Sequence, residues 1–363
     1  MRRFLISILT FIGMVLGAVG QEAEYVVVDG VRYRLEARDG DYTALVAGFS
    51  GPPISTTVPE SVTYNDVDYT VVGTISNLLK GGMFEIQSIV FPETMTSIGS
   101  GCFWGCKIEG LMKLPNSLKE IGMCSFTNIS GPGELILPES IDEIPWLTFT
   151  GMNVKLVIPS GIKHFAGHSM MSLGVIPDYD FRNGRYFGSG SFKQSVLEEV
   201  AFSDGVTFGK GAFSSSKSLY KIDLPEEYTV SEGGAFTGCV NLMRVTSLAP
   251  QPPTTVDLET GQPTEGLVIN VQVPDGCVLY VPQGSKSAYS KSPAWSNFKI
   301  IREIDPAGIE DVEEDAASTD RYEIWNMAGY KVADKPTRQE AVAGLPSGIY
   351  ILRTDAKTEK IIL

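Results

Sequence analysis

A short unit decides the fold of this chain, and it reads IQSIVFPETMTSIGSGCFWGC at residues 86–106 and LYKIDLPEEYTVSEGGAFTGC at residues 219–239. Both copies hold an alternating apolar stretch that ends in an apolar-Pro pair, and both end with a phenylalanine three residues before a cysteine. Alternation predicts a half-buried strand, and proline ends it because proline has no N–H for the next hydrogen bond. Units this short bury their apolar side only by stacking on copies of themselves, so the pattern predicts a solenoid.

Further copies of the unit follow at a nearly fixed period of 21–23 residues. The predicted series of core aromatics is Phe84, Phe103, Phe126, Phe149, Phe192, Phe213 and Phe236, with Met171 filling the longest gap. Apolar-Pro pairs run in step at Phe91-Pro92, Leu114-Pro115, Leu137-Pro138, Ile158-Pro159 and Leu224-Pro225, with Phe181-Arg182 and Phe202-Ser203 in the intermediate positions. We expect Gly99 and Gly122 to provide a positive φ at a corner of each turn.

The repeat region is predicted over residues 76–249. A β-rich N-terminal cap is expected at 21–75, with hairpins that turn at Asp29-Gly30 and Asn65-Asp66. A C-terminal cap is expected at 250–304, with a short helix near 285–291 and Trp295 holding it in place. Unit lengths vary most between Pro159 and Phe202, which indicates either decay of the repeat or a functional bulge.

The ends of the chain differ from the repeats in composition. Residues 1–20 resemble an export signal, with two arginines before an apolar run and small residues at a cleavage site. Residues 305–320 are acidic and rich in small residues, which predicts a linker. Residues 321–363 return to apolar strand patterns at 322–325, 348–352 and 360–363 and are expected to form a small C-terminal β module.

Charge limits the partners that the exported chain would bind. The formal net charge is −14, and removing Arg2 and Arg3 with the signal makes it −16. Nucleic acids and anionic lipids need Lys/Arg patches, so neither is an expected partner. No stretch after the signal is apolar enough to span a bilayer, so no membrane insertion is expected.

Five cysteines occur, at Cys102, Cys106, Cys124, Cys239 and Cys277. Export permits disulfides, and Cys102–Cys106 or Cys106–Cys124 bridges stay open. Because four of the five lie at defined positions of the repeat, we favour buried small apolar thiols.

The sequence holds no recognisable catalytic or metal-binding constellation. Its two histidines, His164 and His168, are spaced like zinc ligands on a helix, but Gly167 and the missing glutamate argue against one. No phosphate-binding loop, nucleophile elbow or dinucleotide fingerprint is present. We therefore predict a non-enzyme with no catalytic residue, metal or cofactor.

The two quoted units resemble the leucine-rich repeats of BspA-type bacterial surface proteins. The match in 86–106 covers the apolar positions, Pro92, Gly99, Phe103 and Cys106, and departs at Cys102, where the family has alanine. The flanks VPESVTYNDVDYTV (58–71) and LYVPQGSKSAYSKSPAWSNFKIIREI (279–304) are similar to that family's lead-in and closing segments. The resemblance implies a β-rich leucine-rich-repeat solenoid on an exported or surface-displayed binding protein, often described as an adhesin.

The C-terminal stretches YEIWNMAGYKV (322–332) and GLPSGIYILRTDAKTEKIIL (344–363) resemble type IX secretion sorting domains. That resemblance implies passage across the outer membrane of a Gram-negative bacterium, with a final place at the cell surface or outside the cell.

A binding face follows from the strand register, because the residue before each apolar-Pro position points away from the core. The predicted ligand-binding residues on this face are Val90, Lys113, Ile136, Val157, Asp180, Glu199, Lys221 and Asp223. We expect one stacked sheet that is partly apolar in its first half and acidic in its second.

The leading hypothesis for function is adhesion, meaning binding of an extracellular host or bacterial protein through this sheet. The alternative is glycan capture by Trp104 and Trp146, since aromatic rings stack on sugars. Packing in the core or at the corners of the repeats is the favoured role for these two tryptophans.

Overall fold

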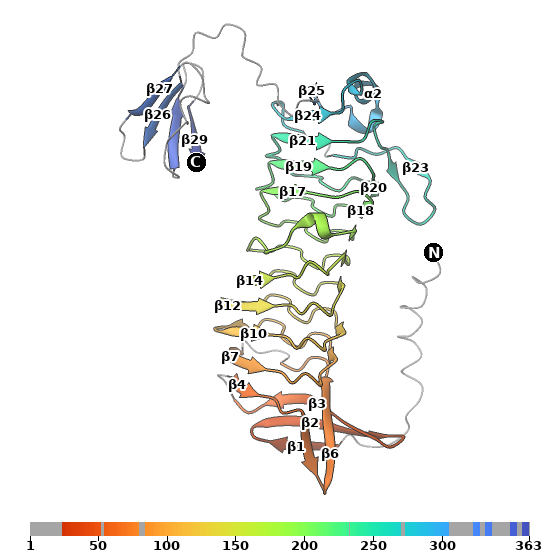
Figure 1. Ribbon diagram of the computed structural model, residues 1–363, viewed down its shortest axis with the longest axis vertical. Helices are drawn as coiled ribbons and strands as arrows, with labels where there is room; N and C mark the ends of the chain where they lie inside the picture. The colour runs from red at the N-terminus through yellow and green to blue at the C-terminus, as the bar shows by residue number, and fades with distance from the viewer. Residues whose placement is uncertain are drawn as a thin grey trace. The chain divides into compact units, whose positions relative to one another are not determined.

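The structure is a computed structural model that describes residues 24–51, 54–79, 84–231, 233–269, 273–304, 322–326, 331–335, 349–353 and 358–362. It contains two compact units that divide between Glu303 and Ile304 (Figure 1). The predicted export signal at 1–20 and acidic linker at 305–320 lie outside the described residues.

The first unit is the predicted leucine-rich-repeat solenoid, in which successive turns of chain stack on one another (Figure 1). One side carries two sheets of parallel strands, which we call the first and second strand sheets. The first contains β4 (Ile54–Thr57), β7 (Glu85–Val90), β9 (Lys107–Ile108), β10 (Leu111–Lys113), β12 (Ser130–Ile136) and β14 (Asn153–Val157). The second contains β17 (Glu199–Ala201), β19 (Lys221–Leu224), β21 (Arg244–Ser247), β24 (Val278–Val281) and β25 (Ile300–Glu303).

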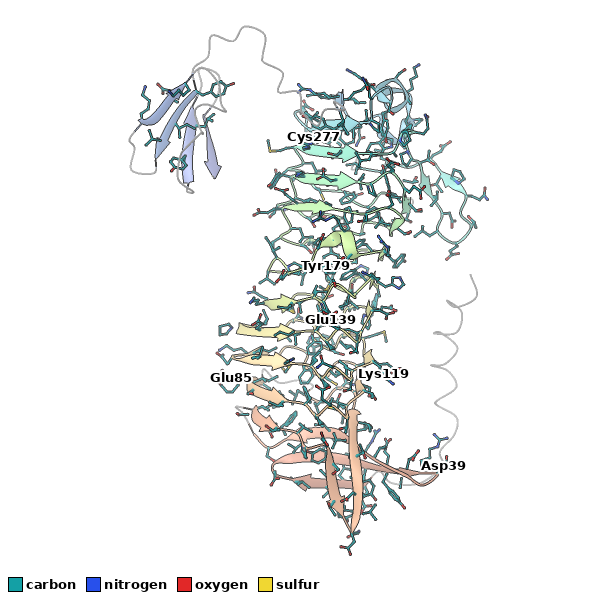
Figure 2. The ribbon with its side chains drawn as sticks, in the orientation of Figure 1. Asp39, Glu85, Lys119, Glu139, Tyr179 and Cys277 are labelled. Atoms are coloured by element: carbon teal, nitrogen blue, oxygen red, sulfur yellow. The ribbon has the colours of Figure 1, made fainter. Side chains whose placement is uncertain are left out.

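A second side of the stack is built from shorter strands, most of which follow the proline corners. They are β8 (Ser97–Ile98), β11 (Glu120–Ile121), β13 (Glu143–Ile144), β15 (His164–Phe165), β16 (Tyr186–Phe187), β18 (Val206–Phe208), β20 (Tyr228–Ser231), β22 (Thr255–Val256) and β23 (Pro263–Thr264). Figure 2 shows Glu85 and Lys119 on opposite sides of the stack. The remaining side consists of turns, and we call it the turn side.

The N-terminal hairpins form as predicted. Their strands are β1 (Glu24–Val28), β2 (Val31–Arg38), β3 (Asp41–Phe49), β5 (Ser61–Tyr64) and β6 (Val67–Thr74). Both residues of each predicted turn have positive φ, 49° and 77° for Asp29-Gly30 and 51° and 62° for Asn65-Asp66. Such turns match the twist of the strands that they join. The cap continues into the repeats because β6 pairs with β8.

A column of stacked side chains fills the core of the repeats. Phe126 is fully buried between Phe103 and Phe149, with ring centroids 5.2 and 5.3 Å away. The predicted series is wrong at two positions. Met170 and not Met171 fills the gap, since Met170 is fully buried and its N–H donates to Ser191 as the N–H of Phe149 does to Ser169.

Phe84 is the second error in the series. Lys107 N–H donates to the carbonyl of Phe84, and Glu85 pairs with Lys107, so Phe84 occupies the position of Cys106. Leu79 takes the core position in that turn, because its N–H donates to Cys102 as Phe103 N–H donates to Ser125. The interval between Phe84 and Phe103 is shorter than the repeat period because Phe84 does not occupy the core position of its turn.

Two left-handed residues four apart shape the turn side of each repeat. The pairs are Gly101/Gly105, Cys124/Asn128, Leu147/Gly151, His168/Ser172, Gly190/Gln194, Gly211/Ser215 and Gly234/Gly238, with φ between 55° and 80°. The expectation of positive φ at Gly99 and Gly122 is therefore wrong. These glycines are needed for close approach, since a Cβ on Gly122 would lie 2.3 Å from the backbone nitrogen of Ser100.

The variable segment between Pro159 and Phe202 is well packed. The 3-10 helix η1 (Phe181–Asn183) replaces a strand there, and Phe181 is buried against Phe192 and Phe213. Tyr179 lies beside it, in the middle of the first unit (Figure 2). The repeat therefore persists through this segment, and only its strand is lost.

The C-terminal cap contains helix α2 (Lys286–Lys291), close to the predicted bounds, and the 3-10 helix η2 (Pro293–Trp295). Trp295 is fully buried against Tyr289, and its Nε1 donates to the carbonyl of Pro253 at 2.9 Å. The expectation that Trp295 holds the cap is confirmed.

The second unit contains a four-stranded antiparallel sheet in the order β27-β26-β28-β29. Its strands are β26 (Tyr322–Asn326), β27 (Lys331–Lys335), β28 (Ile349–Arg353) and β29 (Thr358–Ile362). Ile324, Tyr350 and Leu352 are buried. Of these strands, β27 had no counterpart in the sequence prediction.

Candidate functional site

The outward face of the first strand sheet carries a line of apolar side chains. Val90, Lys113, Ile136 and Val157 lie in register on β7, β10, β12 and β14. Val90 is 51% exposed, and Ile136 and Val157 are partly exposed. Sequence reasoning missed Leu111, which is also 51% exposed and lies two residues before Lys113 on the same face. Alternation along β10 was the signal that would have found it.

Ion pairs between neighbouring strands and within one turn flank this apolar line. Lys155 Nζ lies 2.7 Å from Glu134 Oε1, and Lys107 Nζ lies 2.5 Å from Glu109 and 3.6 Å from Glu85. The hydrogen bond to Glu134 raises the pKa of Lys155, and the hydrogen bond to Glu109 raises that of Lys107. The margin of the face is thus charged and paired, and its centre is apolar except for Lys113, which lies between Val90 and Ile136.

The second strand sheet presents mixed charges on its outward face. Glu199, Lys221 and Arg244 are in register, and Lys221 Nζ contacts Glu199 at 3.1 Å and Asp223 at 3.6 Å. A hydrogen bond from the Tyr220 hydroxyl, followed by that from Lys221, lowers the pKa of Glu199. The guanidinium of Arg244 lies 4.5 Å from the ring centroid of Tyr280. The half of the face that was predicted to be acidic therefore carries paired positive and negative charges.

The expected position of Asp180 in this face is wrong. Val157 forms its bridge with Asp178, so Asp178 continues the outward row. Asp180 instead caps η1, where its Oδ1 accepts hydrogen bonds from Arg182 N at 3.1 Å and Arg182 Nε at 2.9 Å. The side-chain hydrogen bond from Arg182 holds the pKa of Asp180 below its usual range. Helix η1 also divides the predicted single sheet into two.

Trp104 and Trp146 are packed neither into the core nor into corners, and the favoured role for them is thus wrong. They lie on the turn side with 51% and 47% of their surface exposed. Cys124 N–H donates to the carbonyl of Trp146, which places Met123 and Trp146 at equivalent positions of adjacent turns. Met123 is exposed as well.

All five cysteines are free thiols, and all except Cys124 are buried. The bridges left open from the sequence are not formed. His164 lies on strand β15 and His168 in a turn with φ of 56°, so the two do not share a helix face. Within the described ranges, no His, Cys, Asp and Glu side chains gather into a metal-binding group. Nor does that part of the chain contain a helix long and apolar enough to cross a membrane.

Three solved structures illustrate the similarity of the chain to known proteins. They are a leucine rich cell surface protein from Faecalibacterium prausnitzii (14% identity, 78% of this chain and 95% of that chain, TM-score 0.33), the pneumococcal vaccine antigen PcpA (14%, 78% and 99%, 0.34) and a leucine-rich repeat protein from Bacteroides ovatus (15%, 77% and 100%, 0.31). No curated protein matches the chain significantly.

The family comparison concerns the repeats themselves. The model described as "BspA type Leucine rich repeat region" matches in six copies over residues 81–174 and 158–251. These ranges contain the stacked phenylalanines from Phe103 to Phe236 and most strands of the strand sheets. The repeat region of this chain belongs to the BspA-type leucine-rich repeats.

Proposed function

We propose that this protein is an exported, non-enzymatic adhesion protein that binds an extracellular protein through the outward face of its strand sheets. The observation that carries the proposal is the apolar line of Val90, Leu111, Ile136 and Val157, which lies around Lys113 on a sheet with a charged margin. A cluster of exposed apolar residues with a polar rim is typical of a protein-binding surface. The partner is a host or bacterial protein outside the cell.

Membership of the BspA-type repeats supports this proposal, because a stack of such repeats offers an extended face to a partner. The paired charges of Glu199, Lys221 and Asp223 would add specificity at the second strand sheet. Their contribution would weaken with salt, whereas the apolar contacts would persist.

A screen of the purified protein against an array of extracellular proteins tests the proposal. We expect a hit whose binding falls at least tenfold in a Val90→Ser/Leu111→Ser double variant. Leu258→Ser is the matched control, because Leu258 is also an exposed leucine but lies in the hairpin of β22 and β23. Binding that survives the double variant would show that the interface lies elsewhere. Loss of binding with Leu258→Ser would point to the hairpin of β22 and β23 instead.

Delivery to the surface of a Gram-negative cell is the second part of the proposal, and it rests on the resemblance of residues 322–363 to type IX sorting domains. Deleting residues 321–363 should leave the repeat unit folded, because the two units are compact separately. The truncated protein should then fail to reach the cell surface. Surface display that survives the deletion would rule out a sorting role.

Glycan capture for nutrient uptake is the second candidate function. The exposure of Trp146 favours it, since a solvent-facing indole is available for stacking on a sugar. The tryptophans lie on the turn side and the apolar line on the strand sheets, so the two functions use different surfaces and separate variants distinguish them.

A further inference from the structure

The indole of Trp146 packs against Gly167 of the next turn, and we call this contact the seat of the indole. A Cβ built on Gly167 would lie 3.3 Å from Trp146 Cδ1 and 3.7 Å from Nε1. The carbonyl oxygen of Ser189 would lie 3.3 Å from the same Cβ, so that side offers no free space. The absence of a side chain at Gly167 therefore lets the ring rest against the backbone while 47% of the residue stays exposed.

Hydrogen-bonding groups follow Trp146 along the turn side. His168, next to Gly167, lies over Gly190 in the same manner, with Nε2 2.9 Å from the place of a Cβ there. Ser189, on the same turn as Gly190, is exposed and donates its hydroxyl to the carbonyl of Lys210 at 3.0 Å, which leaves oxygen lone pairs to accept. Met123 adjoins Trp146 on the preceding turn. The surroundings are thus one aromatic ring and one methionine, followed by polar groups.

We propose that Trp146, His168 and Ser189 form a glycan-binding site in which a pyranose ring stacks on the indole. The C–H face of a sugar packs on an aromatic ring, while its hydroxyls need donors and acceptors beside that ring. Because the seat on Gly167 holds the indole in place before binding, less side-chain entropy is lost when the sugar binds. This inference rests on the second candidate function and names its residues.

The size and composition of the surface favour a sugar over a protein partner. Trp146 and Met123 are two residues, whereas each partner of a stable protein complex contributes roughly 20–30 residues to the interface. Trp104 lacks the seat, since the next turn presents Thr127 at its position. The structure therefore distinguishes the two exposed tryptophans, and Trp104 serves as the control for Trp146.

The test titrates the purified protein with cellohexaose, xylohexaose, mannohexaose and a galacturonic acid hexamer, and follows tryptophan fluorescence and heat of binding. The acidic and neutral probes separate two classes of glycan. We expect saturable binding of at least one probe, weakened tenfold or more by Trp146→Ala. Trp146→Phe should keep part of the affinity, and Trp104→Ala should keep all of it.

A second variant removes the seat and keeps the ring. Gly167→Ala should displace the indole and weaken binding by several fold, with a melting curve recorded to show that the solenoid remains folded. Val90→Ser/Leu111→Ser should bind the glycan normally even if it loses a protein partner, so failure of one proposal leaves the other intact. The inference is wrong if no probe binds, if Trp146→Ala binds as well as the parent, or if Trp146→Ala abolishes binding only to a protein.

Discussion

The ring of Phe103 stacks on the ring of Phe126, with the centroids 5.2 Å apart and the planes inclined by 14°. Neighbouring parallel strands lie about 4.8 Å apart, so side chains at equivalent positions of adjacent turns meet at nearly this spacing. The pairs Phe126–Phe149, Phe192–Phe213 and Phe213–Phe236 repeat the arrangement. The period of the sequence thus produces a column of core aromatics in which Met170 takes the place of one ring.

Replacing Phe126 with alanine should lower the free energy of unfolding by about 3–5 kcal/mol, because the cavity would lie between two other buried rings. Urea unfolding of the two proteins measures the difference. Val240→Ala, at an exposed position, should change stability by no more than about 0.5 kcal/mol. Equal stability of Phe126→Ala and the parent would contradict the core position of this ring.

Replacing Leu147 with glycine should destabilise the protein less than replacing it with alanine, which is the reverse of the order expected at most positions. Its φ is 56°, and a left-handed conformation costs a residue with a Cβ about 1–2 kcal/mol. Leu147→Gly and Leu147→Ala both remove the side chain, but only glycine relieves the strain. We expect the glycine variant to be more stable by about 1 kcal/mol in thermal or urea unfolding. The opposite order would show that Leu147 is not left-handed.

Gly122 should tolerate no larger residue, for a different reason. Its φ is not positive, but a Cβ there would lie 2.3 Å from Ser100 N and 2.6 Å from Gly99 C. Gly122→Ala must therefore separate two turns, and we expect a loss of about 1–3 kcal/mol. Gly276→Ala is the matched control, because a Cβ at Gly276 meets nothing within 4 Å and its φ is not positive. Equal melting temperatures for both variants would show that the turns are less closely stacked.

The sequence predicted the features that repeat. Alternation before each proline predicted the strand sheets, and the Phe spacing predicted the core column, because stacking places equivalent residues in contact. Errors arose where one turn departs from the others. Phe84 and Met171 were assigned by counting alone, and the hydrogen bonds of Leu79 and Met170 show where the register shifts.

The candidate site was less predictable than the fold. Outward alternation placed Val90 and Glu199 on the strand sheets, but Asp180 left the row because its carboxylate caps η1. Neither the pairing of Lys221 with two carboxylates nor the seat of Trp146 on Gly167 follows from repeat spacing. Both depend on which side chains neighbouring turns happen to present, and that differs at every turn.

The buried thiols make alkaline stability a further test of the core. Burial raises the pKa of Cys239 from 9.0 to about 12, and the pKa values of Cys106 and Cys277 rise to about 12 for the same principal reason. In the unfolded chain a thiol loses its proton near pH 9, whereas in the folded chain it keeps the proton until about pH 12. Unfolding between these values releases a proton, so each such thiol makes stability fall by up to about 1.4 kcal/mol per pH unit.

Below pH 9 the contribution of these thiols to stability is complete, and above it the contribution is progressively lost. We therefore expect Cys239→Ala to show a shallower loss of stability between pH 9 and 11 than the parent, measured by urea unfolding in a reducing buffer. Ser216→Ala is the control, since Ser216 holds the equivalent buried position one turn earlier and does not titrate in this range. It should lower stability by the same amount at every pH. If Cys239→Ala and the parent lose stability with the same slope, the thiol is not buried in the core of the folded protein.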